Sequence, residues 1–314
     1  MSALFPVVVR DVMPEGVDCI RLRLAAAPGQ GTLPRFAPGA HVDVLTPSGL
    51  VRQYSLCGDV DDPGVYELCI KREAASRGGS DSLCRMVDKG MELHISPPRN
   101  AFALPVAQHY VLIAGGIGIT PLLSMMARLQ RQGADWTLYY YTRTPDQAPF
   151  RGRLLVAPYV NRVHMARSLK QGYPAALAHP EADTAIMLCG PNGFMQAVSS
   201  HAIAAGWEPE QIHTEYFCPT EAAPDDEEQA FEVILARSGR SLTVPPGQSI
   251  ADALMAAGIE VNLSCEQGMC GACVVPLLAG EGAHRDMVMT EEEQACSIAL
   301  CCSRARTPSL TLDL

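Results

Sequence analysis

Three cysteines near the carboxyl end of the chain have a spacing that suits an iron–sulfur cluster. Cys265, Cys270 and Cys273 form the pattern C-x4-C-x2-C, and Cys301 follows later. This is the plant-type arrangement of thiolates around a 2Fe-2S cluster. The intervening residues include small ones such as Gly268, which leave room for three thiolates to converge on two irons. We therefore predict that the cluster ligands are Cys265, Cys270, Cys273 and Cys301.

A zinc site made of four cysteines is the main alternative for these residues. Zinc ribbons pair two C-x2-C knuckles, however, and this sequence contains a single one. Cys296 and Cys302 also lie within reach in sequence as fourth ligands. We favour Cys301, because an apolar residue precedes it and a short strand from Leu310 to Leu312 follows the turn after it. Cys302 is then a neighbour of the cluster, and Cys296 is expected to be a buried helix thiol.

The composition narrows the class of protein. Hydrophobic residues make up 48% of the 314 residues and charged residues 18%, which is enough to build two or three compact domains. The formal net charge of -10 argues against nucleic acid or an anionic membrane as a partner. Most of the 12 cysteines lie outside the cluster spacing and we expect no signal peptide, so a reducing cytoplasm is favoured. The uncharged run from Ala101 to Ala127 is interrupted by glycine and proline, which favours strand, turn and helix over a membrane span.

The first hundred residues predict an antiparallel β-barrel. Short alternating runs between Leu4 and Pro98 are separated by Pro, Gly and Asp. One run contains Arg52-Gln53-Tyr54-Ser55, in which Arg52 and Tyr54 would share one face of a strand while Ser55 points the other way. Such a strand could seat a planar aromatic ligand against the tyrosine with a phosphate near the guanidinium. An ordinary strand with one exposed arginine is the plainer alternative.

A glycine-rich turn strengthens the case for a phosphate in this region. Arg77-Gly78-Gly79-Ser80 follows a strand that ends at Lys71. Backbone N–H groups in a glycine-rich turn that opens a helix bind phosphate well. The turn and the Arg52 strand together therefore predict a site for a phosphorylated cofactor.

The middle of the chain has the context of a dinucleotide site. An apolar strand, Tyr110 to Ala114, runs into Gly115-Gly116-Ile117-Gly118-Ile119-Thr120-Pro121 and then into a helical run. The pattern is not G-x-G-x-x-G, because Pro121 takes the place of the third glycine, as at the first position of a helix. Further apolar strands at Thr137 to Tyr141 and Ala185 to Leu188 predict a parallel sheet with flanking helices.

The last of these strands ends in Cys189-Gly190-Pro191, where ligands sit in open parallel sheets. Cys189 alone would most simply be a small buried hydrophobe. The presence of both this turn and the glycine turn after Ala114 favours a functional position.

The tail predicts a separate module. Residues 218 to 229 carry prolines, small residues and acids, which is typical of a solvated linker. A hairpin follows, then a helix that Ser249 caps and Gly258 ends, then the cysteine loop. Thr290 and Glu293 form a capping box for a later short helix. Strand, strand, helix and cysteine loop is the order of a plant-type ferredoxin, which has a β-grasp fold.

A series of motifs precedes the ferredoxin-like tail: RQYSL, CIKRE with RGGS, SPPRNAF, GGIGITP and CGP. Together with the tail, these motifs resemble the phthalate dioxygenase reductase and vanillate O-demethylase reductase family of the ferredoxin-NADP reductase superfamily. The resemblance implies FMN in the barrel, NADH in the middle domain and a 2Fe-2S cluster in the tail. It places Thr120 and Cys189 near the nicotinamide, Arg143 near the adenosine and Phe217 near the flavin. NADH is favoured over NADPH by this likeness and by the lack of a clear basic pair for a 2'-phosphate. The implied cofactor-binding residues are Arg52, Gln53, Tyr54, Ser55, Ile70, Lys71, Arg77, Gly78, Gly79, Ser80, Gly115, Gly116, Gly118, Thr120, Arg143, Cys189, Gly190, Pro191 and Phe217.

We therefore predict a multidomain α+β and α/β protein. Residues 1–104 form an antiparallel flavin barrel, 105–218 a parallel-sheet NAD domain, 219–229 a linker and 230–314 a β-grasp ferredoxin domain. By resemblance, the chain passes electrons from NADH to a separate Rieske-type oxygenase that acts on an aromatic or related compound. Two alternatives are a stand-alone reductase for a cytochrome or di-iron hydroxylase, and a redox-sensing or zinc-binding protein without activity.

Overall fold

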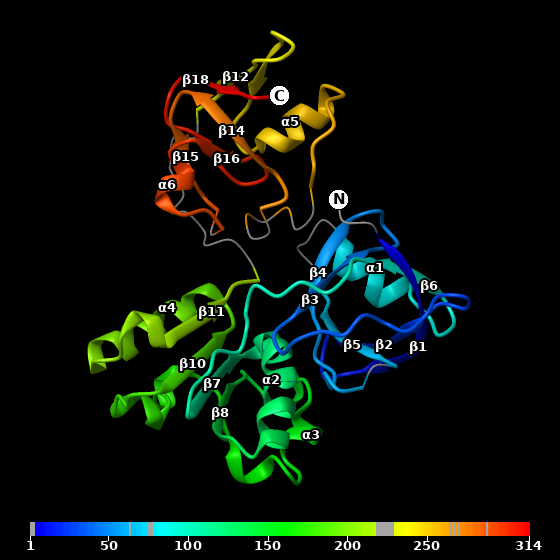
Figure 1. The fold of residues 1–314 in the computed structure, drawn as a ribbon, viewed down its shortest axis with the longest axis vertical. Coiled ribbons are helices and arrows are strands. Elements are labelled where there is room, and N and C mark those ends of the chain that lie inside the picture. Colours follow the sequence, from blue (N-terminus) through cyan, green and yellow to red (C-terminus); the bar gives the residue numbers. More distant parts are fainter. Residues whose placement is uncertain are drawn as a thin grey trace. The chain divides into compact units, whose positions relative to one another are not determined.

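The computed structural model describes residues 4–62, 64–73, 78–217, 229–263, 266, 268, 271–286 and 288–314. The chain divides into two compact units, one covering Ser2–Phe217 and the other Cys218–Leu314 (Figure 1). The predicted flavin and nicotinamide segments thus belong to one unit. The predicted linker falls almost entirely outside the described residues, as do Arg77, Cys265 and Cys270.

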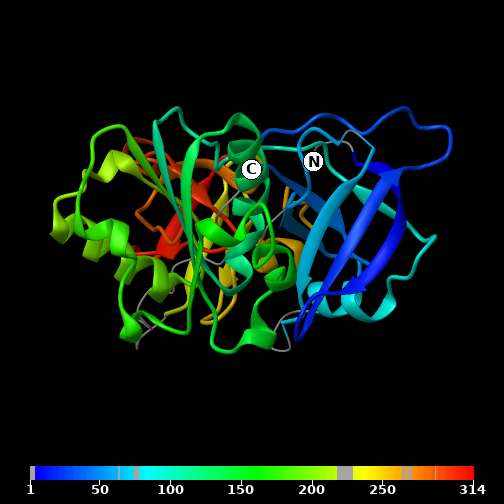
Figure 2. The ribbon, with the colours of Figure 1, turned by 90° about the horizontal axis from the view of Figure 1, so that it is seen from below.

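The first unit begins with the predicted antiparallel barrel. Its six strands have the order β4-β3-β6-β1-β2-β5, and a bridge between Leu56 and Leu68 connects the two outer strands and closes the sheet. Fully buried residues such as Val7, Leu22 and Leu24 fill the interior, as the alternating sequence predicts. Helix α1 (Gly79–Met86) packs against β4 and β5 at one end of the barrel (Figure 2). The strands are β1 (Phe5–Pro14), β2 (Cys19–Ala26), β3 (His41–Leu45), β4 (Val51–Ser55), β5 (Tyr66–Lys71) and β6 (Glu92–Ile95).

The same unit contains the predicted parallel sheet, with the order β11-β10-β7-β8-β9. The chain runs outward from β7 through β8 to β9 and then returns to the other side of β7. The strand order therefore reverses between β7 and β10, which is where open parallel sheets bind ligands. The elements are β7 (His109–Gly115), β8 (Asp135–Tyr141), β9 (Val163–Ala166), β10 (Thr184–Cys189), β11 (Ile212–Glu215), and helices α2 (Ile119–Gln132), α3 (Arg151–Leu154) and α4 (Asn192–Ala205).

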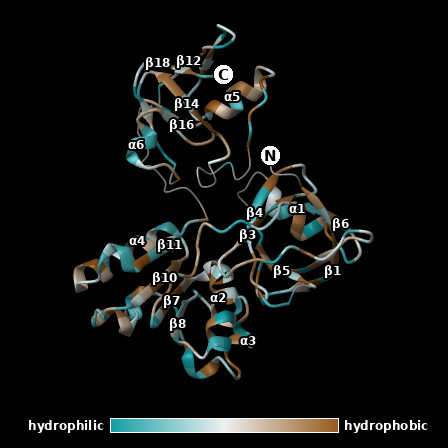
Figure 3. Ribbon diagram, viewed as in Figure 1, coloured by the Kyte–Doolittle hydropathy of each residue, from teal (hydrophilic) through white to brown (hydrophobic). Residues whose placement is uncertain are grey.

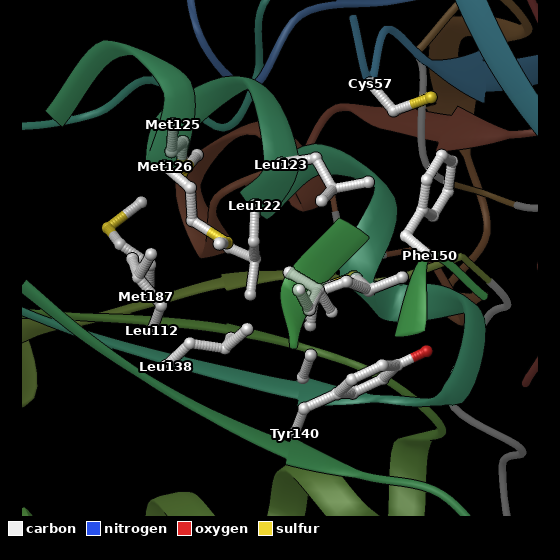
Figure 4. Packing of buried hydrophobic residues seen from close by; sticks show 14 of the residues in the cluster. Cys57, Leu112, Leu122, Leu123, Met125, Met126, Leu138, Tyr140, Phe150 and Met187 are labelled. Carbon is white, nitrogen blue, oxygen red and sulfur yellow. The ribbon is translucent and has the colours of Figure 1, made fainter. Parts of the chain in front are cut away.

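The barrel and the parallel sheet share one hydrophobic core. Cys19, Cys57 and Cys69 of the barrel belong to the same buried cluster as Met125 of α2 and Phe150. Cys57 lies near Phe150 in this cluster (Figure 4). Polar contacts reinforce the junction, because Ser124 Oγ accepts the Gly39 N–H at 3.1 Å and Glu15 Oε1 accepts the Phe150 N–H at 2.8 Å.

The second unit has the predicted ferredoxin-like order. A five-stranded sheet, β13-β12-β18-β14-β16, pairs β12 and β18 in parallel at its centre. Ser249 caps α5 by accepting the Asp252 N–H, as predicted. Helix α5 is largely hydrophobic and α6 hydrophilic (Figure 3). The elements are β12 (Phe231–Leu235), β13 (Ser241–Val244), α5 (Ile250–Ala256), β14 (Val274–Ala279), β15 (Gly282–Ala283), α6 (Glu291–Gln294), β16 (Ser297–Ala299), β17 (Arg304–Ala305) and β18 (Ser309–Leu312).

Two local expectations are wrong. Pro121 is the third residue of α2, because the 3-10 turn Gly116–Gly118 leads into a helix that starts at Ile119. Cys296 is an exposed thiol outside any helix. The capping box of Thr290 and Glu293 does form, but the helix that it opens has only four residues and ends before the cysteine.

Candidate functional site

The two glycine loops of the parallel sheet meet at the point where the strand order reverses. Ala114 of β7 pairs with Cys189 of β10, so the turns that follow these residues leave the same edge side by side. A Cβ added at Gly118 would lie 2.3 Å from the Cys189 carbonyl oxygen. One added at Gly190 would lie 3.0 Å from the Gly115 Cα. The sequence therefore needs glycine at these positions to let the two backbones approach.

Thr120 and Cys189 both lie at this junction and both are buried. The Thr120 hydroxyl donates a hydrogen bond to the Ile117 carbonyl at 3.0 Å, which ties it to the turn that opens α2. Burial raises the pKa of the Cys189 thiol well above its usual value. The sulfur is therefore a neutral thiol at physiological pH and is not a thiolate nucleophile.

Glu215 is a site residue that sequence reasoning missed. It is the last residue of β11 and pairs with Cys189 across the sheet. Its Oε2 is buried and has no hydrogen-bond partner among the described residues. Burial raises the pKa of the carboxyl group to about 8, so the group is largely protonated at neutral pH. A buried carboxyl group with unused hydrogen-bonding capacity can bond to a polar group of a ligand.

Phe217, which the resemblance places near the flavin, lies two residues beyond Glu215. Its side chain packs against the core that the barrel and the parallel sheet share. The sequence signal for both residues is the segment HTEYF, in which a carboxyl group stands just before aromatic residues at a strand end. An acidic residue in that position is unusual for a half-buried strand.

The predicted phosphate seat is assembled at the start of α1. A Cβ added at Gly79 would lie 3.0 Å from Arg52 Cγ and 3.2 Å from Arg52 Nε, so the arginine of β4 touches the first turn of the helix. Gly78 precedes the helix with a φ of 95°, a conformation that favours glycine. A guanidinium beside the N-terminal turn of a helix is suited to a phosphate. Arg77 lies outside the described residues.

The other predicted barrel residues have different environments. Tyr54 packs against the barrel core, and burial raises the pKa of its phenol, which stays neutral. Ser55 is buried at the end of β4. Gln53 Nε2 lies 3.5 Å from His41 Nε2, and burial, followed by the nearby Arg99, lowers the pKa of that imidazole to about 4. His41 is thus neutral and supplies a polar neighbour without charge.

Three further predicted residues of the barrel domain have side chains that are buried or bonded to other residues of the protein. Ile70 is fully buried in the barrel core. Lys71 forms an exposed ion pair with Glu73 at 2.5 Å. Ser80 Oγ accepts the Glu73 N–H at 3.1 Å. Ile70 therefore has only its backbone to offer a cofactor, and Lys71 and Ser80 would have to give up or share these bonds.

Two of the four predicted cluster ligands lie within the described residues, and they converge. The Cys273 and Cys301 side chains are in hydrogen-bonding contact. Cys301 Sγ also accepts the Gly268 N–H at 3.2 Å. A Cβ on Gly268, whose φ is 70°, would lie 2.6 Å from Cys302 Sγ. The loop therefore requires glycine at this position. The arrangement of the two described thiols, Cys273 and Cys301, fits a cluster held by thiolate ligands. Within the described residues, no group of three or more His, Cys, Asp or Glu side chains could hold a metal ion.

Arg143 lies at the same edge of the sheet as this junction, beyond β7 on the side away from β10. It follows the end of β8, where its side chain is exposed. That position is one strand away from the glycine turn after β7, consistent with a ligand that extends along the edge of the sheet. No helix among the described residues is both long and apolar enough for a membrane span.

Comparisons with known proteins identify the family to which this chain belongs. A model of the 2Fe-2S iron-sulfur cluster binding domain matches residues 233–306. The chain is 42% identical over 310 residues to the vanillate O-demethylase oxidoreductase of Pseudomonas putida, covering 96% of each chain. The solved structure of phthalate dioxygenase reductase aligns with a TM-score of 0.81 at 33% identity, over 99% of this chain and 98% of that one. The chain belongs to the phthalate dioxygenase reductase family.

Membership of the phthalate dioxygenase reductase family confirms the predicted resemblance and fold class. The chain is accordingly an NADH-dependent oxidoreductase with flavin, pyridine-nucleotide and 2Fe-2S modules. The same modules also align with part of an intact type IV self-sufficient cytochrome P450 monooxygenase. That match has a TM-score of 0.78 and 34% identity, and it covers 99% of this chain but 41% of the other.

Proposed function

We propose that this protein is the reductase component of a Rieske-type oxygenase system, and that it carries electrons from NADH through FMN and a 2Fe-2S cluster to a separate oxygenase. The observation that carries the proposal is the contact between the loops after β7 and β10. This contact lies in the same compact unit as the barrel that bears Arg52 and α1. A nucleotide site and a phosphate seat in one compact unit are what hydride transfer between two bound cofactors requires.

At the nucleotide crevice, the residues of this chain bind and orient the nicotinamide. Gly118 and Gly190 let the two loops pack backbone against backbone, and the ring would lie against the surface that these loops form. Cys189 adds a neutral, polarizable surface. The protonated carboxyl group of Glu215 can hydrogen-bond to the carboxamide of the nicotinamide. Together these residues fix the distance and exclude water, which is the protein's part in hydride transfer.

In the barrel, Arg52 and the first turn of α1 would hold the FMN phosphate. FMN is chosen over FAD because the resemblance implies a short barrel without loops that grip an adenosine. Tyr54 and Phe217 would contact the isoalloxazine. When bound, the flavin accepts a hydride and releases electrons singly, and the cluster carries one electron at a time.

In the second unit, Cys265, Cys270, Cys273 and Cys301 would hold the cluster. The N–H of Gly268, which points at Cys301 Sγ, stabilises negative charge on that thiolate. Hydrogen bonds to cluster sulfurs are one of the ways in which a protein sets the reduction potential.

The oxygenase and its substrate are inferred from the family. A relative named vanillate O-demethylase oxidoreductase supports a substrate that is aromatic or related to one. The formal net charge of -10 supports docking on a basic partner surface, and the partner is expected to be neither nucleic acid nor membrane. The localisation that we propose is the cytoplasm.

A cytochrome acceptor is the second candidate, supported by the alignment with the reductase-sized part of a self-sufficient cytochrome P450.

The experiment that distinguishes the two candidates uses the full-length protein after reconstitution with FMN, iron and sulfide. Its absorption spectrum should show flavin and cluster bands that bleach with NADH. The reduced protein should then reduce a Rieske-type oxygenase faster than a cytochrome P450. A colourless protein that binds zinc would overturn both candidates.

A further inference from the structure

Two adjacent cysteines bring their sulfur atoms to the same part of the predicted cluster loop. Cys301 and Cys302 lie in a turn after β16, in which the Ser303 N–H donates to the Ala299 carbonyl at 3.1 Å. Successive side chains of a strand point to opposite faces, whereas those of a helical turn differ in direction by about 100°. The turn therefore lets neighbouring sulfurs approach each other, and the Cys301 and Cys302 side chains are in hydrogen-bonding contact.

Cys302 also packs against the glycine of this loop that donates to Cys301. A Cβ on Gly268 would lie 2.6 Å from Cys302 Sγ, so the sulfur occupies the space that a side chain at this position would take. Gly268 is buried, and its N–H donates to Cys301 Sγ at 3.2 Å. The Cys302 sulfur thus lies beside both the predicted ligand sulfur and the backbone group that is bonded to it.

A chain of hydrogen bonds reaches Cys302 from its other side. Ser303 Oγ accepts the Arg285 N–H at 3.3 Å and lies 3.8 Å from Cys302 Sγ, which is within hydrogen-bonding distance for sulfur. Ser303 is fully buried. Its hydroxyl hydrogen can donate to Cys302 Sγ, and the Cys302 S–H can donate in turn to Cys301 Sγ. Hydrogen bonds that follow one another in a single direction polarise each other, which strengthens the last bond of the chain.

The fold holds this chain of hydrogen bonds in place. Strands β15 and β17 are paired, which brings the segment of Arg285 beside Ser303. Arg304 of β17 is buried, and its guanidinium donates to two backbone carbonyls in the segment before α5, at 3.2 Å and 2.6 Å. Cys302 therefore lies between fixed neighbours, and little side-chain freedom remains to be lost when its thiol makes a hydrogen bond.

Donors that point at the sulfur ligands of an iron–sulfur cluster affect its reduction potential. Reduction adds one negative charge, which the ligand sulfurs share. A donor beside such a sulfur stabilises this charge and therefore raises the potential. A cluster of higher potential is a better acceptor for electrons from a flavin.

We propose that Cys302 is a positioning residue for the 2Fe-2S cluster and not one of its ligands. Its S–H donates to the Cys301 thiolate, at the end of the chain that begins at the Arg285 N–H and passes through Ser303, and this bond raises the reduction potential of the cluster. The inference rests on the proposed function, because it assigns a further role at the cluster that this function requires.

The test measures the midpoint potential of the cluster in the full-length protein loaded with FMN and cluster. Dithionite and mediator dyes set the potential, and the EPR signal of the reduced cluster is followed. Cys302→Ala removes the donor and its volume, whereas Cys302→Val removes the donor and retains a similar volume. Both should make the equilibrium constant for reducing the cluster roughly threefold to tenfold smaller, the effect of losing one hydrogen bond, which corresponds to a potential about 30 to 60 mV lower. Cys302→Ser keeps a donor and should lie closer to the wild type than either.

Cys296→Ala is the matched control, because it removes an exposed thiol from the same unit and should leave the potential as it is. Wild-type potentials in both Cys302→Ala and Cys302→Val would overturn the inference. A lower potential in Cys302→Ala alone would also overturn it, because the effect would then come from packing against Gly268. Loss of the cluster from both variants would identify Cys302 as a ligand and would contradict the proposed role.

The result does not depend on the other steps of the proposed function. Dithionite supplies the electrons, so neither NADH nor an oxygenase takes part in the titration. If NADH fails to reduce the flavin, or if the reduced protein fails to reduce a Rieske-type oxygenase, the proposed function fails. The potentials of the wild type and the Cys302 variants still decide whether this thiol donates to the cluster.

Discussion

Glu215 has the least ordinary environment among the residues of the proposed nucleotide site. Its carboxyl group is buried beside Cys189, one oxygen lacks a partner among the described residues, and burial raises its pKa to about 8. In the unfolded chain the same group titrates near 4.5. Between these two values the folded protein binds more protons than the unfolded chain, so stability falls as the pH rises from about 4.5 to about 8.

Glu215→Gln should therefore stabilise the first unit increasingly as the pH rises. The amide stays neutral, so the gain over the wild type should be small at pH 5 and should reach about 2 kcal/mol or more at pH 8, since one pKa unit corresponds to about 1.4 kcal/mol. Urea unfolding followed by tryptophan fluorescence reports on this unit, because both tryptophans, Trp136 and Trp207, lie in it. Glu210→Gln, at an exposed position, is the control. If the free energy of unfolding changes with pH in the same way for the wild type and for Glu215→Gln, the Glu215 carboxyl group does not cause the pH dependence.

Substitution of Arg52 tests whether the predicted phosphate seat binds the phosphate of FMN. Arg52→Ala removes the guanidinium that touches the first turn of α1 and should weaken FMN binding by roughly tenfold to a hundredfold. Fluorescence titration of the flavin-free protein with FMN measures the Kd directly. Riboflavin, which lacks the phosphate, should bind the wild type and the variant with similar affinity. If FMN affinity is unchanged, Arg52 does not contact the phosphate.

Sequence reasoning at the residue scale succeeds where chemistry is local and fails where it depends on a neighbouring strand. The spacing of Cys265, Cys270 and Cys273 is local and needs no fold to be recognised. Glu215 is noteworthy only because β11 places it beside Cys189 in a site that desolvates it. The wrong expectation for Cys296 is a matter of helix length, which a capping box at the start does not determine.

At the scale of elements, the meeting of the β7 and β10 loops depends on glycine for steric reasons. Gly118 has an ordinary helical φ of -61°, so its backbone alone does not demand glycine. Glycine is required because a Cβ at Gly118 would lie 2.3 Å from the Cys189 carbonyl oxygen. The alternation of strand and helix predicted the parallel sheet, but the closeness of these two turns depends on the return of the chain to β10, which no local pattern contains.

Gly118→Ala should therefore separate the two loops and damage the nucleotide site. We expect kcat/KM for NADH to fall by at least about tenfold while FMN remains bound, because the flavin site is built on other strands. Stopped-flow measurement of flavin reduction by NADH tests this outcome. Gly193→Ala is the matched control, since a Cβ at Gly193 in α4 has no neighbour within 4 Å. A Gly118→Ala protein with the wild-type rate of flavin reduction would contradict the steric argument.

At the scale of the whole molecule, the domain that matches the 2Fe-2S family belongs to a different compact unit from the proposed nucleotide site. Cys270→Ser should abolish the absorbance of the 2Fe-2S cluster and the reduction of the oxygenase. It should retain most of the NADH-to-ferricyanide activity, which we assign to the first unit alone. Visible absorption spectra and steady-state assays on one preparation provide both readings. If the two activities disappear together, the division of labour between the units is wrong.

The shared core of the first unit decides where this chain can be cut and rejoined. Cys19, Cys57 and Cys69 of the barrel pack in one cluster with Phe150 and the α2 side chains, so a break near residue 104 would expose apolar surface on both fragments. Among the residues that the structure describes, each hydrophobic cluster lies wholly within residues 4–217 or wholly within residues 229–314. Gene fusions that exchange the ferredoxin-like tail for another carrier should therefore give well-behaved chimaeras when joined after Phe217. Swaps of the barrel alone should yield aggregates.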